Sequence, residues 1–129
     1  MTGKASVLVV DDDTTMREIL DFYLQRQGLV VSIAENGRRA IQLIQANQYD
    51  LVITDMEMGS VNGLEVVRFA KTYRPDIFVI MITGNYEVGL RKDAFRLGVD
   101  DFLYKPFDLA SLFRRLPDHF LESTKKFDK

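Results

Sequence analysis

The 129-residue sequence contains no cysteine and only one histidine, His119. A chain without cysteine forms no disulfides, and nothing in it indicates export to an oxidising compartment. No apolar run approaches the roughly 20 residues that a membrane-spanning helix needs. The first residues, MTGKAS, lack the apolar core of a signal peptide. We therefore expect a cytoplasmic protein, and we assign His119 no role.

The chain also lacks a large excess of either charge: 17 Lys and Arg nearly balance 19 Asp and Glu, and the net charge is −2. This balance gives no bulk attraction for nucleic acid. The basic pair Lys125 and Lys126 is followed by Phe127 and Asp128, which interrupt the cluster. We expect no direct nucleic-acid binding by this chain and no membrane association. The length and the 47% content of hydrophobic residues are typical of one globular domain.

Short β-branched runs alternate along the chain with longer segments of helical periodicity. The runs that predict strands are 7–10, 30–34, 51–54, 77–82 and 101–104. Strict alternation of strands and helices implies right-handed βαβ crossovers and a mostly parallel sheet with helices on both faces. The sequence therefore predicts an α/β fold, and no repeat or internal linker divides it.

The helix boundaries follow from capping residues. We expect a capping box of Thr15 and Glu18 to open the first helix and Gly28 to close it. Asn36 and Asp108 are expected to cap the second and the fifth helices. Apolar spacing marks the third helix at Leu64, Val67 and Phe69 and the fourth at Val88, Ala94 and Phe95.

Polar residues follow or end four of the predicted strands. Asp11, Asp12 and Asp13 follow the first strand, Asp55 the third and Lys105 the fifth, and Thr83 ends the fourth. The carboxyl ends of parallel strands lie along one edge, where open α/β sheets bind their ligands. We expect Asp11, Asp12 and Asp55 to share a crevice, with Lys105 and the Thr83 hydroxyl on its rim. Asp13 is better explained as a helix cap or a solvated neighbour.

Carboxylates that share a crevice repel each other. At ~5 Å and an effective dielectric constant of ~20 the repulsion of one pair is about 3 kcal/mol, so three together need protons or a cation. Oxygen ligands without a nearby His or Cys favour a hard cation such as Mg²⁺. A cation with open positions, a lysine ammonium and a hydroxyl suit the equatorial oxygens of a transferring phosphoryl group. Asp55 would then be the nucleophile.

Five segments resemble the receiver domain of two-component response regulators. They are VLVVDDD, AENGRRAI, LVITDMEMGSVNGLEV, MITG and GVDDFLYKPF. Each piece alone is common, but five in the right order and spacing are specific. The resemblance implies a doubly wound, flavodoxin-like (βα)5 three-layer sandwich whose five-stranded parallel sheet has the order 2-1-3-4-5. It also implies a single receiver domain over residues 1–129, with its core at about 5–116. Pro117 itself predicts a kinked or separate C-terminal helix and tail at 117–129.

The resemblance implies a role for each residue at a matching position. Asp55 resembles the phosphoacceptor and a metal ligand, Asp12 the direct Mg²⁺ ligand, Asp11 a ligand acting through water, and Glu57 a ligand through its main-chain carbonyl. Mn²⁺ is an alternative ion. Lys105 resembles the lysine that contacts the phosphoryl group, Thr83 the switch hydroxyl and Phe102 the switch aromatic residue. The bond between Lys105 and Pro106 resembles the family's cis peptide.

In this family the aspartate accepts a phosphoryl group from the phosphohistidine of a sensor histidine kinase or phosphotransfer protein. The added charge draws Thr83 toward it and Phe102 turns inward, which reshapes the face formed by the fourth helix, fifth strand and fifth helix. That face controls an output partner or domain, and it forms homodimers in some members. The resemblance thus implies no enzyme in the usual sense, but a phosphoacceptor that catalyses its own phosphotransfer and dephosphorylation.

Three positions depart from the family pattern. Gly59 stands where proline is usual, and we expect it to loosen the loop beside Asp55. Gly84 gives the loop after Thr83 more freedom, beside two positions that tune dephosphorylation in the family, Glu57 and Asn85. Pro117 is expected to end or kink the fifth helix near Arg115.

Three alternatives remain open from the sequence. A flavodoxin-like FMN protein shares the fold but needs a Ser/Thr/Gly-rich phosphate loop where this chain has DDDTT. A haloacid-dehalogenase-like phosphatase also uses an aspartate nucleophile and Mg²⁺, and Asp11 and Asp13 fit its motif loosely. The short chain and the lack of a cap domain count against it. The third alternative is a receiver that docks partners without being phosphorylated.

Overall fold

The computed structural model describes residues 4–121, which form a five-stranded parallel sheet with helices on both faces. The strands are β1 (Ser6–Val10), β2 (Val30–Ala34), β3 (Leu51–Thr54), β4 (Phe78–Thr83) and β5 (Asp101–Tyr104). The helices are α1 (Thr14–Arg26), α2 (Gly37–Ala46), α3 (Gly63–Tyr73), α4 (Leu90–Arg96) and α5 (Leu109–Arg115), followed by the 3₁₀ helix η1 (Asp118–Phe120). The five predicted strands are confirmed to within one residue.

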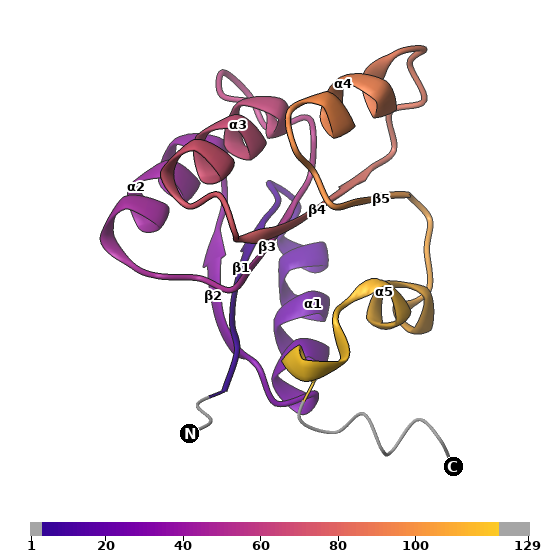
Figure 1. Cartoon of the computed structure of the whole chain (residues 1–129). Helices are drawn as coiled ribbons and strands as arrows, with labels where there is room; N and C mark the ends of the chain where they lie inside the picture. Colours follow the sequence, from indigo (N-terminus) through magenta and orange to yellow (C-terminus); the bar gives the residue numbers. More distant parts are fainter. Residues whose placement is uncertain (1–3, 122–129) are drawn as a thin grey trace.

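The sheet has the order β2-β1-β3-β4-β5, and every neighbouring pair is parallel. The predicted flavodoxin-like α/β fold is therefore confirmed. Helices α1 and α5 lie on one side of the sheet and α2, α3 and α4 on the other (Figure 1). The chain runs outward from β1 in one direction to β2 and in the other to β3, so the crevice expected for a ligand lies at the carboxyl ends of β1 and β3.

Alternate residues of the strands feed two hydrophobic cores, one on each face. The core under α1 and α5 contains Val7, Val9, Leu20, Leu24, Ile53 and Leu112. The core under α2, α3 and α4 contains Leu8, Val10, Ile44, Val67, Met81 and Ala94. A sheet buried on both faces explains why β1 and β3 are continuous apolar runs rather than alternating ones.

The helix caps follow the sequence with one exception. Asn36 and Asp108 cap α2 and α5 through their side chains, as predicted. The predicted capping box of Thr15 and Glu18 is wrong, because Asp13 is the N-cap of α1 and accepts a hydrogen bond from the Thr15 N–H at 3.0 Å. Aspartate is at least as good an N-cap residue as threonine, so the helix starts after the earlier residue, Asp13.

The last two helices are short. The prediction that Val88 belongs to α4 is wrong, since the helix begins only after Gly89, which has a φ of 94°, and Val88 is 99% exposed. Helix α5 ends at Arg115, as predicted from Pro117, and Leu116 is already extended. The predicted C-terminal segment from residue 122 onward lies outside the described residues. In the range 4–121, no helix is long and apolar enough to cross a membrane.

Candidate functional site

The carboxyl ends of β1 and β3 bring three aspartates together. The Asp11 N–H donates to the Ala34 carbonyl at 3.1 Å, and the Asp55 N–H donates to the Val10 carbonyl at 2.9 Å. These bonds continue the sheet one residue beyond each strand. One carboxylate oxygen from each of Asp11, Asp12 and Asp55 therefore lies within 4.8 Å of the others. Asp11 is 3% and Asp55 9% exposed, whereas Asp12 faces solvent.

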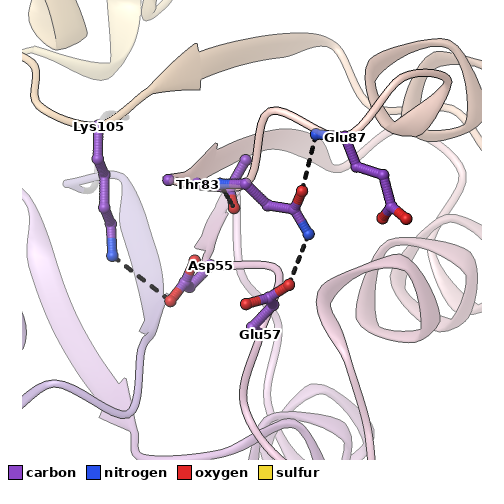
Figure 2. A pocket seen from close by; sticks show the side chains of 7 residues that line it. Asp55, Glu57, Thr83, Glu87 and Lys105 are labelled. Atoms are coloured by element: carbon purple, nitrogen blue, oxygen red, sulfur yellow. Dashed lines mark hydrogen bonds and ion pairs between the residues drawn. The ribbon is translucent and has the colours of Figure 1, made fainter.

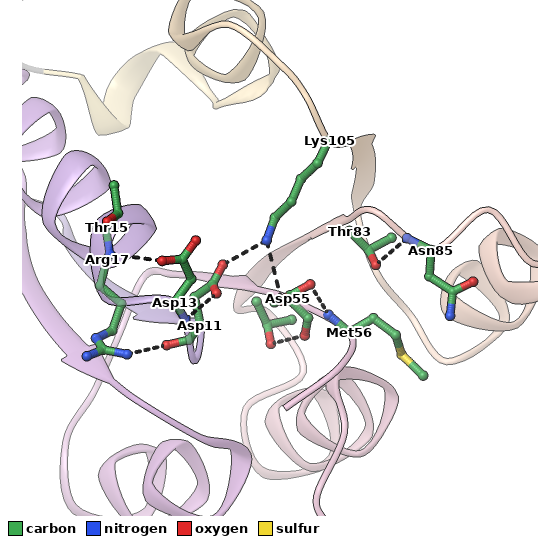
Figure 3. Close-up of polar contacts among 10 residues, drawn as sticks. Asp11, Asp13, Thr15, Arg17, Asp55, Met56, Thr83, Asn85 and Lys105 are labelled. Atoms are coloured by element: carbon green, nitrogen blue, oxygen red, sulfur yellow. Dashed lines mark hydrogen bonds and ion pairs between the residues drawn. The ribbon is translucent and has the colours of Figure 1, made fainter. Parts of the chain in front are cut away.

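Lys105 brings a positive charge to this cluster from the end of β5. Its Nζ lies 3.2 Å from Oδ2 of Asp11 and 3.4 Å from Oδ2 of Asp55 (Figure 3). The backbone of Lys105 continues the β4–β5 ladder, because its N–H donates to the Thr83 carbonyl at 2.8 Å. The expected association of Lys105 with Asp11 and Asp55 is thus present, and the peptide bond between Lys105 and Pro106 is cis.

The electrostatics of the cluster are dominated by burial. Burial raises the pKa of Asp55, the charge of Asp11 raises it further, and Lys105 and the Met56 N–H oppose the shift. Burial alone would lower the pKa of Lys105, but the two carboxylates outweigh it and the net pKa is raised. Lys105 therefore stays protonated, while the ionised form of Asp55 is disfavoured. A cation beside Asp55 would relieve that cost.

The backbone around Asp55 is fixed by local hydrogen bonds and by a close approach of α3. Oδ1 of Asp55 accepts from the Met56 N–H at 2.7 Å, and the Gly63 N–H donates to the Met56 carbonyl at 2.7 Å. A Cβ on Gly63 would lie 2.2 Å from the carbonyl oxygen of Asp55. Only glycine therefore lets the start of α3 pack against the candidate nucleophile.

The loop between β4 and α4 forms one wall of the site. A pocket beside Asp55 is lined by Asp55, Glu57, Thr83, Gly84, Asn85, Glu87 and Lys105 (Figure 2). The Thr83 side chain is buried, and its Oγ accepts from the Asn85 N–H at 3.0 Å. Nδ2 of Asn85 donates to Oε2 of Glu57 at 2.5 Å. A hydrogen bond between two lining residues thus links the loops after β3 and β4.

Phe102 lies inside the protein. It is 4% exposed and belongs to the core under α2, α3 and α4. Its ring meets the ring of Tyr104 edge-on, with the centroids 5.1 Å apart. Any switching motion of Phe102 starts in this structure from a buried ring rather than from one in solvent.

The donor set of the cluster fits a hard divalent cation. All candidate side-chain ligands are carboxylate oxygens, and the exposed Asp12 leaves one side open to water, which Mg²⁺ retains when it binds proteins. Among residues 4–121, Lys105 supplies the ammonium that faces Asp11 and Asp55. Asp11, Asp12 and Asp55 would hold such an ion. The roles assigned to Glu57 and to the other site residues from the resemblance stay predictions.

The sequence did not predict the contacts that two side chains, Arg17 and Tyr86, make near the cluster. Nη1 of Arg17 donates to the main-chain carbonyl of Asp11 at 2.8 Å and so anchors the loop after β1. Tyr86 donates through its hydroxyl to the main-chain carbonyl of Lys105. Asp13 does what was expected of it and caps α1.

Comparison with known proteins identifies the class that this fold and site define. The family model of the response regulator receiver domain matches residues 7–117. The chain belongs to that family: it is a receiver domain of two-component response regulators. This membership displaces the flavodoxin-like FMN and phosphatase alternatives.

Individual relatives agree with this assignment. Response regulator MprA of Mycolicibacterium vanbaalenii is 37% identical over 110 residues, which cover 85% of this chain and 48% of that protein. The response regulator protein TrrA of Thermotoga maritima, solved in complex with Mg²⁺ and BeF, has a TM-score of 0.80 and 31% identity, over 89% of this chain and 98% of that one. A Burkholderia pseudomallei response regulator with a phosphorylated aspartic acid, a calcium ion and citrate has a TM-score of 0.83 and 26% identity, over 88% of this chain and 67% of that one.

The length of the match is also informative. The chain spans about half or less of the length of curated relatives that it matches: 48% of MprA and 26% of the transcriptional regulatory protein ZraR of Klebsiella oxytoca. The receiver domain model matches residues 7–117 of this chain.

Proposed function

We propose that Asp55 accepts a phosphoryl group from the phosphohistidine of a sensor histidine kinase or a phosphotransfer protein. One carboxylate oxygen of Asp55 attacks phosphorus as the bond from phosphorus to the imidazole nitrogen breaks, and the imidazole leaves with the electron pair. The raised pKa of Asp55, caused first by burial, makes this carboxylate more basic than an exposed one. The result is a mixed anhydride on Asp55.

Lys105 is the residue of the proposed site that contacts the transferring group. Its ammonium already lies between Asp11 and Asp55, so it is placed to neutralise charge on an oxygen of the phosphoryl group. Mg²⁺, held by Asp11, Asp12 and Asp55, would supply further positive charge to the same oxygens, and Mn²⁺ is the alternative ion. The proposed reaction is therefore dependent on a divalent cation.

The switch in this proposal starts at Thr83. Its hydroxyl oxygen now accepts from the Asn85 N–H, and a phosphoryl group on Asp55 would offer the hydroxyl proton a charged acceptor. When Thr83 turns, the loop after β4 loses that contact, and the buried ring of Phe102 repacks beside it. The face formed by α4, β5 and α5 then changes for an output partner, an output domain or a second copy of this chain.

The proposal places the protein in the cytoplasm as a switch rather than an enzyme on other substrates. It catalyses only its own phosphorylation and dephosphorylation. The kinase and the output are partners that act through separate chains or domains, and this chain itself binds no nucleic acid.

The observation that carries the proposal is the cluster of Asp11, Asp12, Asp55 and Lys105 at the switch point of the sheet. It is tested by intact-protein mass spectrometry after treatment with phosphoramidate. We expect a gain of one phosphoryl mass that requires both Mg²⁺ and Asp55, so that Asp55→Asn shows none and the control Asp13→Asn shows a full gain. No gain in the wild type, with Mg²⁺ still bound, would favour the docking-only receiver.

A further inference from the structure

Tyr86 makes an unusual connection between two loops of the site. It lies three residues after Thr83, and its hydroxyl donates to the main-chain carbonyl of Lys105. Its ring stacks on that of Tyr104, with the centroids 4.8 Å apart and an angle of 21° between the planes. Although Tyr86 is 63% exposed, its ring and its hydroxyl are thus both engaged by the end of β5.

The loop that Tyr86 anchors begins and ends with glycine. It runs from Gly84 to Gly89, and Gly89 has a φ of 94°. Glycine at both ends lets the segment adopt several conformations unless side chains restrict it. Within the loop, the Glu87 N–H donates to Oδ1 of Asn85 at 2.8 Å. Side chains tie the loop to the rest of the site through Asn85, which contacts Thr83 and Glu57, and through Tyr86, which contacts Lys105 and Tyr104.

The same loop forms a wall of the pocket beside Asp55. Gly84, Asn85 and Glu87 line that pocket together with Asp55 and Lys105, and Asn85 is hydrogen-bonded to Glu57. Tyr86 does not line it, but its two sequence neighbours do. The bond between Tyr86 and the backbone of Lys105 is therefore one of the contacts that link this wall to the end of β5, beside those that Asn85 makes with Thr83 and Glu57.

We propose that Tyr86 is a positioning residue that holds this wall over Asp55 and so limits the access of water to the phosphorylated site. The inference rests on the proposed function. In the step concerned, a water oxygen attacks phosphorus, the bond from phosphorus to the Asp55 oxygen breaks, the carboxylate leaves and the water proton passes to solvent. Loosening the loop gives water more frequent access and speeds this step.

The test compares Tyr86→Phe with the wild type. Each protein is phosphorylated with phosphoramidate and Mg²⁺, the donor is removed, and loss of the phosphoryl mass is followed by intact-protein mass spectrometry. Loss of one neutral hydrogen bond corresponds to a population change of roughly twofold to tenfold, so we expect dephosphorylation to be faster by that factor. Tyr86→Leu, which also removes the ring stacking, should be at least as fast, and the Mg²⁺ affinity of both variants should equal that of the wild type.

Tyr73→Phe is the matched control, because the Tyr73 hydroxyl donates to the carbonyl of Gln45 at 3.4 Å on the far side of α3. It should dephosphorylate at the wild-type rate. If Tyr86 were only structural, its variants would melt at a lower temperature with an unchanged rate. An unchanged or slower rate in Tyr86→Phe overturns the inference while leaving the proposed function intact. A wild type that never acquires the phosphoryl group overturns both.

Discussion

Binding of Mg²⁺ should stabilise the folded protein, and this stabilisation should depend on Asp12. Three carboxylate oxygens lie within 4.8 Å of one another. At that distance one pair of like charges repels by about 3 kcal/mol at an effective dielectric constant of ~20. Lys105 offsets part of this for Asp11 and Asp55, but Asp12 forms no ion pair with any residue in the range 4–121. The folded state therefore gains from a cation that the unfolded chain does not hold.

The expected size follows from linkage. At a Mg²⁺ concentration of about ten times the dissociation constant, a ligand that binds only the folded state contributes roughly 1.4 kcal/mol. In a domain of this length, 1 kcal/mol shifts the melting temperature by roughly 3–5 °C. Thermal unfolding followed by circular dichroism should therefore show a rise of about 4–7 °C in the wild type and little or none in Asp12→Ala.

Asp13→Ala is the control for this experiment, because Asp13 adjoins the cluster but caps α1 instead. Losing the cap should lower the melting temperature, at a cost of about 1 kcal/mol, by the same amount with and without Mg²⁺. The gain from Mg²⁺ should survive in full. An equal gain in Asp12→Ala, or a gain lost in Asp13→Ala, would refute the assignment of the ligands.

Three further predictions concern single residues of the site. Lys105→Ala should keep or slightly raise the Mg²⁺ affinity, because a competing positive charge is removed, and it should slow the phosphorylation of Asp55. Loss of metal binding, measured by calorimetry, would contradict this role of Lys105. Gly63→Ala should destabilise the fold by about 1–3 kcal/mol in urea unfolding, because its Cβ would lie 2.2 Å from a backbone oxygen. Gly84→Ala should destabilise it much less, because its Cβ would meet only a side-chain carbon at 4.0 Å. Gly59→Pro should lower stability rather than restore the family pattern, and the same unfolding assay checks it.

The fold was predictable because its signals are local and consistent. Apolar runs of strand length alternate with helical spacing, and Asn36 and Asp108 mark helix starts by side-chain chemistry alone. The error at α1 arose because Asp13 and Thr15 both satisfy the rules for an N-cap, and only the path of the loop after β1 selects between them. The error at α4 arose because the apolar Val88 fits the spacing, although Gly89 turns the chain before the helix begins.

The acidic cluster was predictable because parallel strands place their carboxyl ends on one edge. Two contacts that fix the loops around the cluster were not. The bond of Arg17 to the Asp11 carbonyl and that of Tyr86 to the Lys105 carbonyl both end on main-chain atoms. No residue type at the receiving position signals such a contact, so a sequence pattern carries no trace of it. Gly63 leaves a similarly faint signal, because only the approach of α3 to Asp55 explains why a side chain is excluded there.

Gly59 shows how a departure from a family pattern acquires a different meaning from the backbone. From the sequence, glycine in place of proline predicts a looser loop. In the structure Gly59 has a φ of 91°, and a Cβ there would meet nothing within 4 Å. A larger side chain would therefore fit at this position, but the positive φ favours glycine. Proline, with its φ fixed near −65°, cannot adopt this backbone conformation. Gly59→Pro should cost about 1–3 kcal/mol through this strain, and Gly59→Ala less. Equal stability of Gly59→Pro and the wild type would mean that the loop readily takes the conformation that proline requires.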